Sequence, residues 1–143
     1  MPDIPVDEHI VRAVSSGFIN EDNEITSAAF QLKRGEEYLS VCRLEHFSTD
    51  DVNTEEALIN QVKIDISHSY TLNDSHQLAV LNVGNTKTYV SEETPDSTSL
   101  EFCKEPSKIK SHSGIYNISP HPDLFIAELI AETVCSSYKV GEL

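Results

Sequence analysis

Three early segments of the chain predict β-strands, the first because it is mostly apolar and the other two because apolar and polar side chains alternate along them with a period of two. The segments are residues 9–14, residues 25–32 and residues 38–44. Gly35 lies in the short charged turn between the second and third segments. Because this connection is short, we expect these two strands to pair as a hairpin.

A longer apolar run covers residues 76–83 and predicts a buried strand. Gly84 and Asn85 follow it directly and are typical of tight turns, so we expect a hairpin whose second strand includes residues 86–90. The polar stretch at residues 91–99 contains a proline and predicts an exposed loop. Two more short strands are expected, at residues 99–103 and residues 113–119.

Apolar residues recur at helical spacing in two other segments. The two apolar stripes are Leu58, Ile59, Val62 and Ile66, and then Phe125, Ile126, Leu129, Ile130, Thr133 and Val134. Asn53 and Glu56 fit a capping box at the start of the first helix. Pro120 and Pro122 mark the start of the second helix, and Gly141 lies just past its expected end.

Strands, a helix, more strands and a final helix predict an α+β domain. We expect a mainly antiparallel sheet of about five to seven strands with two helices, the C-terminal helix being packed on the sheet. A chain of 143 residues is long enough for one domain with its own core. We expect this single domain over residues 9–140, behind a flexible N-terminal segment at residues 1–8.

The chain is strongly acidic, with 24 acidic against 10 basic residues and a formal net charge of −14. Nucleic-acid binding depends on neutralising phosphates with Lys and Arg, so direct binding to nucleic acid is not expected. The acidic residues are spread along the chain, which favours a well-solvated surface. The alternative is an acidic face that docks on a basic partner or mimics nucleic acid.

No apolar run approaches the length of a membrane span, and the N-terminus lacks the features of a signal peptide, so we expect a cytoplasmic protein. Cys42, Cys103 and Cys135 are widely separated and odd in number, which favours free thiols over disulfides or a zinc site. The histidines share no metal-ligand spacing, and no glycine-rich phosphate loop or nucleophile motif is present. We therefore expect no metal and no cofactor, and an enzymatic role is not favoured.

Polar residues on the predicted strands would form a site if the fold brings them together. They are Arg12, Ser27, Ser40 and His112. Arg12 interrupts an apolar strand, where a charge must reach solvent, pair with an acid or line a cleft. A fixed cation with hydroxyl groups and an imidazole suits an anionic, phosphorylated ligand. The alternative is structural, with Arg12 as an edge-strand charge, the serines as space-filling residues and His112 as a turn residue.

In the order of these residues, the chain resembles a group of small bacterial proteins. The shared pattern is Arg12, then Ser27-Ala28-Ala29-Phe30, then Leu39-Ser40-Val41, then His112, with an acidic helix behind it. This chain has Thr26 where the group often has a serine, and Ser113 where alanine is usual. The resemblance implies shared positions and a gene neighbourhood of mobile or defence type, and it implies no particular reaction.

Several functions are compatible with these features. Acidity, small size and the lack of a catalytic motif favour a protein-interaction or accessory component of a bacterial operon of mobile or defence type. Such a component would bind a protein partner or associate with itself. An alternative is a small enzyme, or a binder of a nucleotide or phosphorylated ligand, that uses the four polar residues. In outline it is similar to an ADP-ribosyltransferase, with Glu101 or Glu128 as the carboxylate. Another alternative is a nucleic-acid mimic or antitoxin-like binder of a basic partner.

Overall fold

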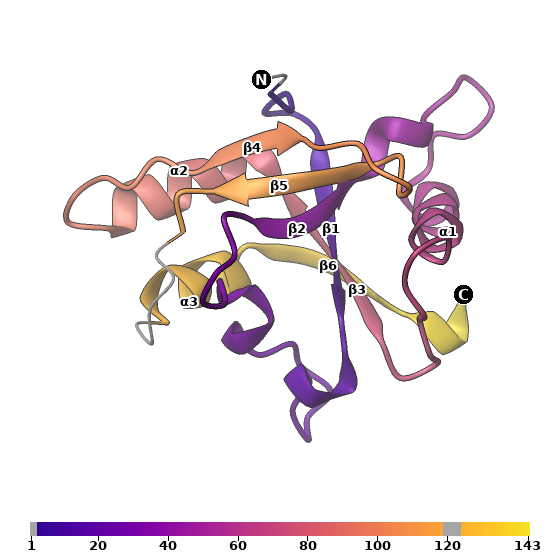
Figure 1. The fold of residues 1–143 in the computed structure, drawn as a ribbon, viewed down its shortest axis with the longest axis horizontal. Helices are drawn as coiled ribbons and strands as arrows, with labels where there is room; N and C mark the ends of the chain where they lie inside the picture. Colours follow the sequence, from indigo (N-terminus) through magenta and orange to yellow (C-terminus); the bar gives the residue numbers. More distant parts are fainter. Residues whose placement is uncertain (1–2, 119–123) are drawn as a thin grey trace.

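One antiparallel sheet of six strands organises the computed structural model, which describes residues 3–118 and 124–143 (Figure 1). The strands are β1 (His9–Val14), β2 (Leu39–Arg43), β3 (Gln77–Asn82), β4 (Glu101–Lys104), β5 (His112–Tyr116) and β6 (Val134–Lys139). They lie in the order β4-β5-β2-β1-β3-β6, and every neighbouring pair is antiparallel. The expected α+β fold with a mainly antiparallel sheet is confirmed.

Helices cover both faces of this sheet (Figure 1). They are α1 (Glu55–Ile66), α2 (Val83–Glu93) and α3 (Phe125–Glu132). Buried residues of α1 pack in one core cluster with Leu78 and Val80 of β3. Those of α2 and α3 pack in another cluster with Ala79 and Leu81. Successive strand residues point to opposite faces, so α1 lies on one face and α2 and α3 lie on the other. The predicted packing of the C-terminal helix on the sheet is confirmed.

The strand predicted at residues 25–32 does not form, and the hairpin that depended on it is wrong. Ser27–Phe30 is a short 3-10 helix in which Ala29 and Phe30 are buried. The segment alternates in polarity, but serine and alanine have little preference for strands. Phe30 is fully buried in the cluster that contains α3, so packing of this ring holds the helical turn against the sheet.

The hairpin predicted at Gly84 and Asn85 is also wrong, because α2 begins there and supplies a helix that was not expected. The Asn82 side chain accepts a hydrogen bond from the backbone N–H of Asn85 at 2.8 Å and thereby caps the helix. The buried residues of the helix are Val83, Thr86 and Val90. The helix takes in residues 86–90, which were predicted as a strand, and the first part of the loop predicted at residues 91–99.

Both predicted helices form, with differences at their ends. The cap of α1 is Thr54 rather than Asn53, and Thr54 Oγ1 accepts a hydrogen bond from the Ala57 N–H at 3.3 Å. The C-terminal helix ends at Glu132, earlier than its apolar stripe predicted, because Val134 starts the edge strand β6. The prolines predicted to start this helix lie outside the described residues.

The two edges of the sheet differ. At the β4 edge, Ile4 is buried and its N–H donates to the carbonyl oxygen of Phe102 at 2.9 Å, while Asp3 forms a β-bridge with Cys103. At the other edge, β6 pairs with β3 and with no further strand in the described part of the chain. The flexibility expected for residues 1–8 stays a prediction.

β1 and β2 are paired over a short distance and then separate (Figure 1). Their register covers Ile10 opposite Arg43 and Val11 opposite Cys42. β1 nevertheless pairs with β3 along its whole length. Arg12 is therefore the first residue of β1 that has left β2 while still being held by the sheet on its other side.

Candidate functional site

The Arg12 side chain bridges the region where β1 and β2 separate. Its Nε donates to the carbonyl oxygen of Ala29 at 3.0 Å, and its Nη1 donates to the carbonyl oxygen of Ser40 at 2.8 Å. These bonds fix the guanidinium, which carries further N–H donors on Nη1 and Nη2. None of the ion pairs among residues 3–118 and 124–143 involves Arg12. Arg12 is a positioned cation that still has donors to offer.

Ser40 and His112 meet on the same face of neighbouring strands. In the β2–β5 register His112 lies opposite Cys42, so Ser40 is its diagonal neighbour. His112 Nε2 is 3.3 Å from Ser40 Oγ, and His112 Nδ1 is 2.7 Å from the carbonyl oxygen of Glu105. The Tyr38 ring packs edge-on against the imidazole, with ring centroids 5.8 Å apart. The imidazole is held on several sides, whereas Ser40 is exposed.

A cavity of about 470 Å³ opens beside these side chains, and its lining includes Arg12, Ser40 and His112. We call it the Arg12 cavity. Its volume falls within the range of about 300–1,000 Å³ typical of small-ligand sites. Ser27 does not line it, because it lies in the 3-10 helix rather than on a strand. That helix contributes indirectly, since its Ala29 carbonyl holds Arg12.

Other residues of the Arg12 cavity were not predicted from the sequence. Lys33 adds a second cation, Glu36 adds one carboxylate, and the exposed Tyr70 adds an aromatic ring. Much of the remaining wall is apolar: Val11, Ala13, Phe18, Val41, Ile66 and Ile109. The adjacent bases Lys33 and Arg34 in an acidic chain were an available signal, whereas Tyr70 follows α1 without a recognisable pattern.

The charge balance of the Arg12 cavity differs from that of the whole molecule. Burial lowers the pKa of the Arg12 guanidinium and the charge of Glu36 opposes this effect, but a guanidinium stays protonated at neutral pH. Arg12 and Lys33 together outweigh Glu36, although the chain carries a net charge of −14. A positive cavity in an acidic protein favours an anion locally.

Asp65, near the end of α1, fixes the segment that leads into β5. Its carboxylate accepts hydrogen bonds from the Lys110 N–H at 3.0 Å, the Ser111 N–H at 2.8 Å and the Ser111 hydroxyl at 2.6 Å. Burial raises the pKa of Asp65, but these hydrogen bonds outweigh it, so the pKa lies below its ordinary value. His112 is the next residue, so Asp65 positions the imidazole through the backbone.

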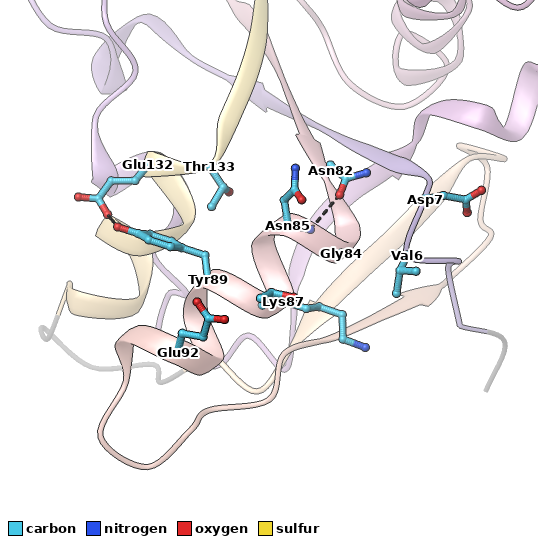
Figure 2. Close-up of a pocket in the computed structure, with 11 residues that line it drawn as sticks. Val6, Asp7, Asn82, Gly84, Asn85, Lys87, Tyr89, Glu92, Glu132 and Thr133 are labelled. Carbon is cyan, nitrogen blue, oxygen red and sulfur yellow. Dashed lines mark hydrogen bonds between the residues drawn. The ribbon is translucent and has the colours of Figure 1, made fainter.

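A second and more open concavity, of about 1080 Å³, lies between α2, the end of α3 and the N-terminal segment (Figure 2). Figure 2 shows Tyr89 reaching from α2 toward Glu132, and Tyr89 Oη donates to this carboxylate at 2.5 Å. Asp7, Glu92 and Glu132 outnumber the single base Lys87 in its lining. This concavity repels anions, and none of the predicted site residues lines it.

The two carboxylates of the ADP-ribosyltransferase-like outline do not line the Arg12 cavity: Glu101 lies on β4 and Glu128 on α3. Among the described residues, no three side chains of the His, Cys, Asp or Glu type are grouped to hold a metal ion. Within the same ranges, no helix combines the length and the apolar character that a membrane crossing requires. Comparisons of the chain with protein-family models, with curated proteins and with solved structures find no match.

Proposed function

We propose that the Arg12 cavity binds a small anionic ligand that carries a phosphate group, such as a nucleotide or a phosphorylated metabolite. The observation that carries this proposal is the position of the Arg12 guanidinium and the partners that it has. Two backbone carbonyls hold its guanidinium beside a cavity, and no carboxylate in the described ranges forms an ion pair with it. Drawing a charge away from water is unfavourable unless a partner compensates it, and a bound anion is such a partner.

The other residues of the cavity suit the same ligand class. A guanidinium donates in parallel to two oxygens of a phosphate, and Lys33 supplies a second, more mobile positive charge. Ser40 and Tyr70 add hydroxyl groups, while the apolar wall accepts a less polar body. Ligand sites typically combine such a wall with a few convergent polar groups.

Calorimetric titration with pyrophosphate, a nucleoside monophosphate and a sugar phosphate tests the proposal. Each hydrogen bond to a charged group contributes about 1.5–3 kcal/mol, so Arg12→Met is expected to weaken binding by about tenfold or more. Arg34→Met is the matched control, because it removes the same charge from an exposed residue outside the cavity lining. No binding of any of these compounds to the wild type, or equal binding by both variants, would refute the proposal.

Self-association is a second candidate role, favoured by the edge strand β6. This strand contains no acidic residue and a single base, Lys139, and its outer side has no strand partner in the described part of the chain. An edge without acidic residues is the place where two copies of an acidic molecule approach with least repulsion. Light scattering after size exclusion measures the mass in solution. A monomer at all concentrations up to about the millimolar range, where even weak association would show, would rule this role out.

A further inference from the structure

Ser40 and His112 form a hydroxyl–imidazole pair whose proton positions follow from their partners. A backbone carbonyl carries no proton, so the 2.7 Å contact between His112 Nδ1 and the Glu105 carbonyl requires a proton on Nδ1. In the neutral imidazole Nε2 is then the acceptor. The contact of 3.3 Å to Ser40 Oγ is therefore a hydrogen bond in which the serine hydroxyl donates to His112 Nε2.

Neighbouring residues hold the imidazole in this orientation. Gly114 lies opposite Ser40 in the β2–β5 register, and a Cβ atom placed on it would lie 2.6 Å from Cδ1 of Tyr38. The absence of a side chain at Gly114 lets the Tyr38 ring lie across β5, where it packs edge-on against His112. Asp65 fixes Ser111, directly before the histidine. The base is thus positioned by packing and by hydrogen bonds from several elements.

This arrangement has the parts that activate a serine nucleophile: a hydroxyl, a base that accepts its proton, and a group that orients the base. Ser40 is exposed at the cavity rather than buried as a packing residue. Arg12 donates to the carbonyl oxygen of Ser40 itself, so a positive charge stands next to the nucleophile. Cys42 also lines the cavity, but burial raises its pKa to about 11. Its thiol therefore stays protonated at neutral pH and does not compete with Ser40 as a nucleophile.

We propose that Ser40 is a nucleophile and His112 its general base in the hydrolysis of a carboxylic ester that bears an anionic group. This inference rests on the proposed function, because Arg12 and Lys33 hold the anionic part of the substrate.

Ser40 Oγ forms a bond to the ester carbonyl carbon while its proton moves to His112 Nε2, and the carbonyl π electrons move to the carbonyl oxygen. The tetrahedral intermediate collapses and expels the alcohol, which takes the proton from His112 Nε2 and leaves an acyl-Ser40 ester. Water then attacks this ester and gives its proton to His112 Nε2. Collapse of the second intermediate releases the acid and returns that proton to Ser40 Oγ. The net reaction is ester plus water to acid plus alcohol.

Labelling with a fluorophosphonate probe, followed by peptide mass mapping, tests the nucleophile. We expect the wild type to carry the label on Ser40, Ser40→Ala to lose it, and His112→Gln to react more slowly by about 10²-fold or more, as is typical for loss of a general base. Ser137→Ala is the matched control, because Ser137 is exposed on β6 and lies outside the Arg12 cavity. It is expected to label like the wild type.

Hydrolysis of the anionic ester mono-4-nitrophenyl succinate provides the second readout. His112→Gln is expected to hydrolyse this ester more slowly by about 10²-fold or more, as is typical for loss of a general base. No labelling of Ser40 in the folded wild type, or equal labelling of His112→Gln, overturns the inference. Binding of pyrophosphate to the wild type reports separately on the proposed function. Binding of pyrophosphate without labelling of Ser40 would refute the nucleophile alone. The absence of both binding and labelling would refute both proposals.

Discussion

Replacement of Asp65 with alanine is expected to destabilise the fold strongly. The Asp65 side chain is 3% exposed and accepts one hydrogen bond from Lys110 and two from Ser111. Ser111 is itself buried, so its N–H and its hydroxyl lose their acceptor in the interior, whereas exposed Lys110 can turn to water. An unsatisfied buried donor costs about 1–3 kcal/mol, so Asp65→Ala is expected to lower the free energy of unfolding by about 2–5 kcal/mol.

Equilibrium unfolding in urea at pH 7, followed by circular dichroism, measures this change. Asp51→Ala is the control, because Asp51 is exposed and its loss is expected to shift the free energy of unfolding by less than about 0.5 kcal/mol. If both variants lose the same small amount, the carboxylate does not hold the segment before β5 and does not position His112.

The same carboxylate predicts a dependence of stability on pH. Its folded-state pKa lies below the ordinary value, because the hydrogen bonds from Ser111 and Lys110 outweigh the effect of burial. A depressed pKa contributes stability that is present above the unfolded pKa of about 3.9 and is lost as the pH falls through the folded-state pKa. Below about pH 4 the free energy of unfolding is therefore expected to fall more steeply in the wild type than in Asp65→Ala. Parallel curves would contradict this reasoning.

Phe30→Ala is expected to lower the free energy of unfolding by about 3–5 kcal/mol, because the ring is fully buried. If urea unfolding shows a loss of less than about 1 kcal/mol, this ring does not hold the 3-10 helix. Gly114→Ala is expected to displace the Tyr38 ring and to cost about 1–3 kcal/mol. Unchanged NMR shifts of the His112 ring in this variant would contradict the role given to Tyr38. The pKa of about 11 predicts that Cys42 reacts with iodoacetamide at pH 8 at least about tenfold more slowly in the native than in the urea-unfolded protein, and equal rates would disprove its burial.

The strands with aliphatic cores were predictable, and segments of small polar residues were not. In β1 and β3 the runs of valine, isoleucine and leucine leave little alternative to a strand. Residues 25–32 alternate in polarity, but their small residues are serine and alanine, which fit a tight helical turn as well as a strand. Gly84 and Asn85 are typical of turns, but the capping side chain of Asn82 starts a helix there. The strand β6 was not predicted, because Val134 continues the apolar stripe of α3.

The candidate site was only partly predictable for a similar reason. Arg12, Ser40 and His112 stand out as polar residues in apolar surroundings, and they line one cavity. Their proximity depends on the β5-β2-β1 order of neighbouring strands, which local patterns do not determine. Ser27 was included because its segment was predicted to be a strand. Lys33 and Tyr70 reach the cavity from connecting segments whose path only the tertiary structure defines.

The burial of β3 has a consequence for how the protein is made. Leu78, Ala79, Val80 and Leu81 are each 0% exposed, and β3 is paired on both sides, with β1 and with β6. β6 leaves the ribosome after every other strand of the sheet. Until then the nascent chain presents one open side of this apolar strand, a ready template for unwanted pairing with other chains. Release of β6 is thus the step at which a vulnerable nascent chain becomes a protected one, and chaperone demand should be greatest just before it.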